Sequence, residues 1–407
     1  MKKISQNRRV VVTGLGVVSS LGIGWQEFWK NLIAGKSGIS LITAFDTSQY
    51  DRHMGGEVKN FDPTKFMSKR KAANYGRASQ MAIAATKLAI EDANLDLKKL
   101  DRTRVGVCIG TTMGEPQVME QIDMKFVKER RKLDYDIKSS LRYPSSNISQ
   151  AVSSHFNIRG QNVVFATACA SGSYSVARAF DLIKMDKCDV VVAGGSDALS
   201  RIAFTGFKRI LAMAPEKCQP FDKNRKGMMM GEGAGILIVE SYEHALKRKA
   251  NIYAEIAGFG MSCDAFHMTE PSEKGVTKAI IKALKNAKIK ADQVDHINAH
   301  GTGTKENDSI ESIAINRVFG SRTKDIPVSA IKSMLGHTMG AASAFESISS
   351  CLSIKTSQIP PTINLETADS ACNVSCFPQG SFAKDLRIVL KSSQAFGGNN
   401  VCTFFKL

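Results

Sequence analysis

The feature of this sequence that most constrains its fold is an order of elements that occurs twice. In the first copy, a helical segment over residues 79–95 precedes the apolar run VGVCIG, which ends in Gly-Thr-Thr. In the second copy, a helical segment over 276–290 precedes VDHINA, which ends in His-Gly-Thr. Each copy continues with another apolar run, a sharp turn of small residues and another helix: VVFATA before CASGSYS, and IPVSAIKS before GHTMGAASA. This self-similarity predicts one duplicated α/β fold in two halves, residues 1–250 and 251–407.

Short apolar runs alternate with helical patterns along the whole chain, which is typical of α/β architecture with largely buried sheets. A hydrophobic content of 43% excludes wholesale disorder. The first half carries a longer, charged insert around residues 117–141. We predict strands at 10–13, 105–110, 163–168, 190–194, 236–240, 252–259, 294–299, 328–331, 387–391 and 402–406, and helices at 79–93, 171–185, 276–287, 308–319 and 340–355.

The N-terminus imitates a secretory signal, but glycine, threonine and serine interrupt its apolar part. We predict instead a strand at 9–13 that runs into a glycine turn. No stretch of about 18 apolar residues occurs, so no membrane span is predicted. The nine cysteines are odd in number and scattered, which favours free thiols in a reducing cytoplasm. Cys372 and Cys376 form a lone C-x-x-x-C without a nearby histidine, so no metal site is predicted.

The formal net charge of +17 favours an acidic partner. Nucleic acid is not expected, because the basic residues are dispersed and no nucleic-acid-binding motif appears. The segment GLGVVSS (14–20) half-imitates a dinucleotide fingerprint, but it lacks the third glycine and a suitably placed acidic residue. A dehydrogenase is therefore not predicted.

The motif ATACASG (166–172) places Cys169 where an apolar strand ends and a helix begins. Unpaired N–H groups and the positive end of the helix dipole at such a position lower the pKa of a thiol and favour the nucleophilic thiolate. Small flanking residues leave room for a substrate. We interpret Cys169 as a nucleophile; the alternative is a small buried cysteine with a packing role.

Two further strand ends deliver histidine into glycine-rich loops. In NAHGTGT (298–304), His300 precedes two threonine hydroxyls that can hydrogen-bond a ligand tail, or else it is a strand-end histidine capped by a turn. In KSMLGHTMG (332–340), we expect Lys332 to hold the imidazole of His337 neutral, and Glu346 on the following helix to balance Lys332. The alternative is a surface turn, although the uncharged GAASAF that follows favours a buried one.

Near the C-terminus, AFGGNN (395–400) follows an apolar strand. Its Gly-Gly turn can aim backbone N–H groups at an oxyanion, although a plain hairpin turn is the favoured interpretation of this motif alone. One cysteine, two strand-end histidines and a strand-end lysine together suggest acyl transfer through a thioester, with the histidines stabilising an enolate-like carbanion.

With these residues the chain resembles the elongating β-ketoacyl-acyl-carrier-protein synthases of the thiolase-like superfamily. The resemblance runs nearly end to end, and its blocks occur in the right order: VVVTGLGVVSSLG, TACASG, VVVAGGSDA, PFDKNRKGMMMGEGAG, DAFHMT, NAHGTGT, KSMLGHTMGAA, PPTINLE and AFGGNN. It implies a duplicated thiolase-like fold layered α-β-α-β-α. The cysteine–histidine–histidine set is similar to that of elongating synthases rather than to thiolases or chain-starting synthases.

The resemblance also implies roles. Cys169 would accept the acyl chain, and His300 and His337 would promote decarboxylation of a malonyl-carrier thioester. The backbone N–H groups of Cys169 and Phe396 would form the oxyanion hole.

Further roles follow from the same resemblance. Lys332 and Glu346 would orient His337. Thr302 and Thr304 would bind the phosphopantetheine arm, which is part of the substrate, so no separate cofactor is expected. The remaining predicted substrate-binding positions belong to the C-terminal loop: Gln394, Gly397 and Gly398.

The chain departs from the housekeeping fatty-acid enzymes at two places. Gln394 stands where those enzymes usually carry a gating phenylalanine, and GTTMGE (110–115) replaces a Gly/Ile-rich acyl-channel loop. We therefore expect a ketosynthase that performs decarboxylative Claisen condensation in type II polyketide or aryl-polyene biosynthesis. The alternatives are a housekeeping fatty-acid elongation synthase and, among non-enzymes, a chain-length-type binding subunit.

An acyl carrier protein is the expected acidic partner, and a homodimer or a heterodimer with a chain-length factor is the expected assembly. Two basic patches are candidates for the docking site. We define patch A as Lys65, Lys69, Arg70 and Lys71, and patch B as Lys125, Lys128, Arg130, Arg131 and Lys132. For patch B a solvated charge run is the competing interpretation.

Overall fold

The computed structural model describes residues 8–128 and 140–407. Its largest sheet contains two runs of five strands with the same internal order. Numbered along the chain within each half, both runs read 3-2-4-5-1. The first run is β6 (Asn162–Phe165), β5 (Val105–Gly110), β7 (Val190–Asp197), β8 (Gly233–Ser241) and β1 (Val10–Ser19). The second is β11 (Pro327–Ser329), β10 (His296–Asn298), β15 (Ile388–Ser393), β16 (Asn399–Lys406) and β9 (Ala254–Cys263).

The strand directions repeat as well. The second strand of each half is parallel to the third and fourth, and the fifth is antiparallel to the fourth and first. The halves join where β1 pairs with β9 through Val11 and Val12. The predicted duplicated α/β fold is thus confirmed, while the boundary near residue 250 stays a prediction. The sheet also includes β2 (Gly22–Ile23) beside β1 and β13 (Ser375–Cys376) beside β11.

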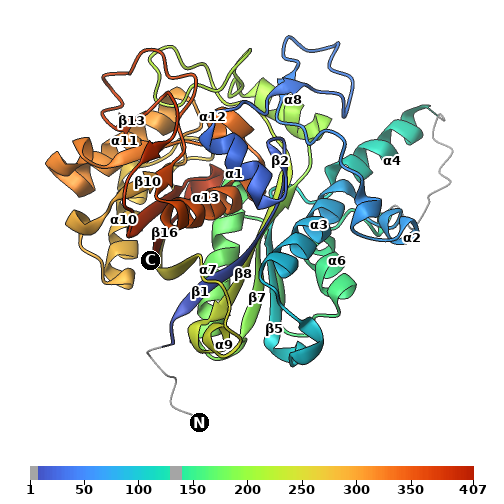
Figure 1. The fold of residues 1–407 in the computed structure, drawn as a ribbon. Helices are drawn as coiled ribbons and strands as arrows, with labels where there is room; N and C mark the ends of the chain where they lie inside the picture. The colour runs from blue at the N-terminus through green and yellow to red at the C-terminus, as the bar shows by residue number, and fades with distance from the viewer. Residues whose placement is uncertain (1–7, 129–139) are drawn as a thin grey trace.

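Helices form three layers around the two halves of the sheet (Figure 1). The helices α3 (Arg77–Asp92) and α6 (Ser146–Phe156) lie against the first half, and α10 (Glu273–Ala287) and α11 (Lys305–Phe319) belong to the outer layer of the second half. Two helices, α7 (Ser171–Lys184) and α13 (Ala342–Thr356), lie between the halves and contact strands of both. This is the layered thiolase-like arrangement that the resemblance implies.

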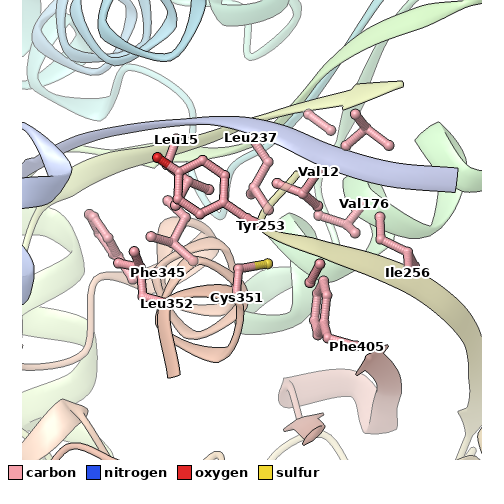
Figure 2. Close-up of a cluster of buried hydrophobic side chains, with 14 of the residues drawn as sticks. Val12, Leu15, Val176, Leu237, Tyr253, Ile256, Phe345, Cys351, Leu352 and Phe405 are labelled. Atoms are coloured by element: carbon pink, nitrogen blue, oxygen red, sulfur yellow. The ribbon is translucent and has the colours of Figure 1, made fainter. Parts of the chain in front are cut away.

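The middle layer contains the largest apolar cluster, part of which Figure 2 shows. Leu237 and Phe405 reach it from the two halves of the sheet, and Phe345 and Leu352 from α13. All four side chains are buried. Burial from both sides explains why α13 is buried along almost its whole length, from Ala342 to Ile354.

The predicted glycine turn after residue 13 is wrong. The first strand continues to Ser19, with a bulge between Val12 and Gly14. A Cβ atom on Gly14 or Gly16 would lie 2.3 or 1.8 Å from a backbone oxygen of α3. These glycines therefore allow a strand and a helix to approach closely, and they do not end the strand.

Several helices were not predicted from the sequence. The longer ones are α6, described above, and α1 (Trp25–Ile33), α4 (Pro116–Lys128), α8 (Arg201–Arg209) and α9 (Tyr242–Lys247). The helix α4 forms the first part of the charged insert, whose residues 129–139 lie outside the described ranges. The remaining short elements are α2 (Lys69–Ala72), α12 (Lys332–Leu335), β3 (Ser40–Leu41), β4 (Met54–Gly55), β12 (Gln358–Ile359) and β14 (Phe382–Ala383). No helix in the described parts of the chain has the length and apolarity to cross a bilayer.

Candidate active site

Loops from both halves of the fold enclose a cavity of about 560 Å³. Most of the predicted site residues line this cavity: Cys169, His300, Thr302, Thr304, His337, Gln394, Phe396 and Gly398. Lys332 and Glu346 are also buried; Lys332 contacts His300, and Glu346 pairs with Lys332. Gly397 is not among the lining residues. Residues more than 200 positions apart in the chain thus meet at one site.

Cys169 lies in a 3-10 turn, Ala168–Ala170, immediately before α7. Ala168 adopts a positive φ of 49°, a conformation that strains a residue with a side chain. The hydroxyl of Ser171 stabilises this turn, because it accepts the N–H of Thr167 at 2.9 Å and donates to the carbonyl of Ala168 at 2.6 Å. The thiol is therefore held at a sharp turn between strand and helix, as the sequence predicts.

The electrostatics of the thiol differ from the prediction. Burial raises the pKa of Cys169 to about 12, and the positive charge of Lys332 offsets only part of this effect. The expected net lowering of this pKa is thus wrong, because loss of hydration penalises the thiolate more than its surroundings favour it. Burial therefore favours the neutral thiol of Cys169.

His300 occupies a tightly held loop. The backbone N–H groups of His300 and Gly301 donate to the Glu311 carboxylate at 2.8 and 2.9 Å. The Nζ of Lys332 lies 3.1 Å from Nδ1 of His300 and donates to its carbonyl oxygen at 2.6 Å. Burial, and then the charge of Lys332, place the pKa of His300 well below its usual value. The ring is therefore neutral at physiological pH.

His337 is oriented by backbone groups instead of by Lys332. Its ring Nδ1 accepts the backbone N–H of Met339 at 3.1 Å, and the backbone N–H of His337 donates to the carbonyl of Met229 at 2.6 Å. Burial, followed by the charge of Lys332, also lowers the pKa of His337 strongly. We predicted that Lys332 and Glu346 orient His337, and this prediction is wrong. The short helix α12 directs Lys332 to His300 instead.

The two imidazoles lie with their centroids 5.6 Å apart and their planes at 86°. Since Nδ1 of each ring accepts a hydrogen bond, the proton of each neutral ring belongs on Nε2. Two Nε2–H donors held by buried, neutral rings can stabilise negative charge that develops on one substrate oxygen.

Lys332 and Glu346 form an ion pair in which both side chains are almost fully buried. Glu346 belongs to α13, so the pair connects the middle helix layer to the His300 loop. The lysine therefore has fixed partners on two sides, which is a requirement for orienting an imidazole.

The C-terminal loop is a 3-10 turn over Phe396–Gly398 that connects β15 to β16. The N–H of Gly397 donates to the carbonyl of Met268 at 2.8 Å, and that of Gly398 to the carbonyl of Ala395 at 3.0 Å. These two N–H groups therefore already have partners, and the contribution of this loop to an oxyanion hole stays a prediction for the N–H of Phe396. Their hydrogen bonds fix the backbone on either side of Phe396.

Gln394 places an amide at the wall of the cavity. Its Nε2 donates to the hydroxyl of Ser392 at 2.7 Å. Its Oε1 has no hydrogen-bond partner within residues 8–128 and 140–407, although the side chain is only 4% exposed. This oxygen is therefore free to accept a hydrogen bond from a group in the cavity.

The two threonines lie side by side at the cavity, with their hydroxyl oxygens 3.0 Å apart. Thr304 also caps α11 by accepting the N–H of Asn307. The carboxylate of Asp308 holds this loop by accepting the N–H groups of Thr302 and Gly303 at 3.1 and 3.2 Å. The loop therefore presents two hydroxyls in a fixed geometry.

Three supporting residues were not identified from the sequence as parts of the site. Glu311 holds the His300 loop, as described above. Arg225 donates to the carbonyl of Thr304 at 3.1 Å, and Asp197 accepts the N–H of Gly340 at 2.7 Å. A signal existed for the last two, because both lie in blocks that carry the family resemblance. Nothing in the sequence alone marks Glu311.

Patch A lies exposed on the chain before α3, with Lys65 at the end of a 3-10 turn and the other three residues on α2. In patch B, Lys125 and Lys128 are exposed on α4. Arg130, Arg131 and Lys132 lie outside the described residues.

A thiol at a strand–helix turn, beside two neutral histidines in a duplicated thiolase-like fold, defines a condensing acyltransferase. The comparisons with known proteins give its family. Residues 7–245 match the family model "Beta-ketoacyl synthase, N-terminal domain", and residues 253–366 match "Beta-ketoacyl synthase, C-terminal domain". The chain belongs to the β-ketoacyl synthase family, and it is a carbon–carbon bond-forming acyltransferase.

Three similar proteins match nearly the whole length of the chain. The 3-oxoacyl-[acyl-carrier-protein] synthase 2 of Synechocystis sp. is 37% identical, over 98% of both chains. The structure titled the ishigamide ketosynthase/chain length factor is 40% identical with a TM-score of 0.96, over 98% of this chain and 99% of the other. A ketosynthase solved with its type II polyketide acyl carrier protein and bound to a hexaketide is 33% identical with a TM-score of 0.90, over the same shares.

Proposed function

We propose that this chain is the ketosynthase subunit of a type II polyketide or aryl-polyene pathway, and that it condenses a malonyl unit with a chain carried on Cys169. The observation that carries the proposal is the buried amide of Gln394 at the cavity wall, with Oε1 unpartnered among the described residues. The 40% identity to the ishigamide ketosynthase/chain length factor structure supports the same pathway class.

The first step of the proposed reaction loads the chain. The sulfur of Cys169 attacks the thioester carbonyl of an acyl group on the phosphopantetheine arm of a carrier protein. A carbon–sulfur bond forms to Cys169, the bond to the pantetheine sulfur breaks, and the thiol proton leaves with that sulfur. Because burial favours the thiol over the thiolate, this proton transfer accompanies the attack instead of preceding it.

The second step uses the two histidines. The malonyl thioester loses its carboxylate as carbon dioxide, and the electron pair of the broken bond forms an enolate. The Nε2–H groups of His300 and His337 stabilise the enolate oxygen. The enolate carbon then attacks the acyl-Cys169 carbonyl, the backbone N–H groups of Cys169 and Phe396 stabilise the oxyanion, and the Cys169 thiolate leaves and takes up a proton. The product is a β-keto chain two carbons longer.

The cavity suits a polar chain better than a saturated one. The amide of Gln394 has both a donor and an acceptor, and the Ser392 hydroxyl that anchors it can act as either. The amide can therefore turn its oxygen toward a hydroxyl or enol, or its nitrogen toward a ketone. A saturated chain offers no such group and would leave the buried amide oxygen unpaired, at about 1–3 kcal/mol. Thr302 and Thr304 supply hydroxyls for the pantetheine arm.

The proposed partner is an acyl carrier protein that docks on patch A. Its four basic side chains are exposed and adjacent. The Synechocystis relative and the hexaketide-bound ketosynthase both carry an acyl carrier protein in their printed names. Acidic carrier proteins approach a basic rim faster, and this attraction weakens with salt.

A second subunit is proposed to join at β6. This strand ends one side of the sheet and pairs only with β5 in the described parts of the chain. Its residues Val163, Val164 and Phe165 are only partly buried, and an edge of this kind is a template for pairing with another chain. Both a second copy and a chain-length factor remain candidates for this second subunit.

All nine cysteines are free, which supports a cytoplasmic location.

Two alternative functions have less support than the proposed one. The name of the Synechocystis relative favours housekeeping fatty-acid elongation, but the polar position 394 argues against saturated chains. A non-catalytic chain-length subunit would not need Cys169 at a strained turn beside two neutral histidines. Treatment with cerulenin followed by an intact-mass measurement tests the latter: we expect one adduct, on Cys169, whereas an unmodified chain would favour the binding role.

The experiment that tests the pathway is co-purification from the native host, followed by mass spectrometry of the carrier-bound chains. We expect unsaturated or keto-substituted chains on the carrier protein. Saturated acyl chains alone would contradict the polyketide assignment and support fatty-acid elongation.

A further inference from the structure

A second lysine is buried next to the catalytic cluster, and the reaction as described does not use it. Lys391, near the end of β15, is 0% exposed. Its ammonium hydrogen-bonds the hydroxyls of Ser173 on α7 and Ser393 on its own strand. It also forms an ion pair with Oε2 of Glu346 at 3.5 Å.

Glu346 is therefore shared by two ammonium groups. Its Oε1 pairs with Lys332 and its Oε2 with Lys391. Within these three side chains, two positive charges face one negative charge, all almost completely removed from water. An uncompensated buried charge is expensive, and an apolar residue of similar size is often more stable at such a position. Fold stability alone therefore does not explain a lysine here.

The surroundings of Lys391 come from five elements. Charged and titratable groups that face it are Glu346 of α13, Lys332 of α12 and Cys402 of β16. The polar groups are Ser173 of α7 and Ser393 of β15. Burial lowers the pKa of Lys391 to about 8, and the Glu346 carboxylate opposes this shift. The positive charge of Lys391 in turn lowers the pKa of His300, although less than burial and Lys332 do.

We propose that Lys391 is a positioning residue for the condensation, which holds Glu346 so that Lys332 is directed at Nδ1 of His300 and His300 stays neutral. This inference rests on the proposed role of His300 as an Nε2–H donor. Glu346 connects the two lysines, and Ser173 connects Lys391 to the helix that follows Cys169. The network thus couples the helix of the nucleophile to the orientation of one imidazole.

The proposal has a consequence that packing alone would not produce. Removing the charge of Lys391 leaves one positive charge fewer around His300, so the imidazolium form becomes less unfavourable. A protonated Nδ1 would face the ammonium of Lys332 and break the hydrogen bond that selects the active tautomer. The rate of decarboxylation falls at low pH, and this acid limb of the pH profile must therefore move to higher pH when the charge is removed.

The test compares Lys391→Met with Lys355→Met. Methionine keeps the length of the side chain, and Lys355 is an exposed lysine at the far end of α13 that contacts Asn251. Carbon dioxide release from malonyl-CoA is measured from pH 5 to 9, and the imidazole ¹⁵N shifts of His300 are followed over the same range. A thermal melt checks the fold.

We expect the acid limb and the His300 titration of Lys391→Met to shift to higher pH, because one of the charges that oppose the imidazolium is gone. Lys355→Met should match the wild type. If Lys391→Met does not fold, Ser173→Ala, which removes one hydrogen-bond partner of the ammonium, should shift both readouts in the same direction by less. A folded variant with an unchanged acid limb and unchanged His300 shifts would overturn the inference. A wild type that releases no carbon dioxide would count against the proposed function instead, and the His300 titration would still decide the role of Lys391.

Discussion

The ammonium of Lys332 lies 3.1 Å from Nδ1 of His300, and it also donates to the carbonyl of the same residue at 2.6 Å. His337 has no such contact and takes its Nδ1 hydrogen bond from the backbone N–H of Met339. The two imidazoles therefore present the same tautomer for different reasons. One depends on a charged side chain that can be removed, and the other depends on the backbone.

Replacing Lys332 by methionine should impair decarboxylation more than acyl loading. Without the ammonium, His300 loses its tautomer selection, and loss of one preorganised donor typically lowers the rate by about 10²-fold. Loading should slow less, because Lys332 only assists Cys169 through its charge. Carbon dioxide release from malonyl-CoA and the intact mass of the acyl-enzyme measure the two steps, with Lys355→Met as the matched control. Equal losses in both steps would contradict this division of roles.

Buried His296 should make stability depend on pH outside the active site. Burial lowers its pKa to about 4, whereas the unfolded value is about 6.5. Between these values the unfolded state binds more protons, so the free energy of unfolding falls as the pH falls. The destabilisation caused by His296→Asn should therefore be about 2 kcal/mol smaller at pH 5.0 than at pH 7.5.

Urea denaturation at the two pH values measures this difference. His267→Asn is the control, because His267 is an exposed histidine. A destabilisation by His296→Asn that is independent of pH would show that burial does not lower the pKa of His296.

Most of the architecture could be predicted because its signals are local and periodic. The strand VGVCIG and the helix after Cys169 are read directly from apolar runs and small residues. The N-terminal strand was predicted too short because Gly14 and Gly16 serve contacts with α3, and a long-range contact leaves no local pattern. The helices α1 and α8 were missed although both are amphipathic, because their apolar stripes are short.

The active site was also predicted only in part. Cys169, His300 and His337 could be found because each lies near the end of an apolar run, in a turn of small residues. The pKa of the thiol was predicted in the wrong direction, since its burial depends on the assembled halves. The partner of Lys332 was also wrong: a sequence shows that Lys332 and His337 are five residues apart, but not that the lysine turns toward a histidine 32 positions earlier.

Gln394 should decide which chains the cavity accepts. Replacing it by phenylalanine adds bulk and removes the amide. A polar intermediate would then have a buried polar group without a partner, so it should be elongated at least about tenfold more slowly than a saturated one. Gln394→Leu separates the two effects, because it removes the amide with little added volume. Carrier-bound products are compared by mass spectrometry. An unchanged product profile in both variants would show that position 394 does not select the chain.

Patch A should govern docking of the carrier protein and not the chemistry. Reversing the charge of both Lys69 and Arg70 to glutamate should raise the KM for a malonyl-carrier substrate about tenfold at low salt, because attraction to the acidic carrier is lost. Turnover of malonyl-CoA should not change. The same double reversal at Lys98 and Lys99, beyond the other end of α3, is the matched control. A KM effect that persists at high salt would point to a different contact.

The central claim is that Cys169 forms the acyl-enzyme while His300 and His337 drive decarboxylation in the same cavity. Replacing Cys169 by glutamine separates these roles, and Cys263→Ser, at an exposed cysteine, controls for the loss of a thiol. Condensation product and carbon dioxide are measured together from a malonyl-carrier substrate and an acyl donor. We expect Cys169→Gln to form no condensation product and to release carbon dioxide within about tenfold of the wild-type rate. Condensation by Cys169→Gln would contradict the account.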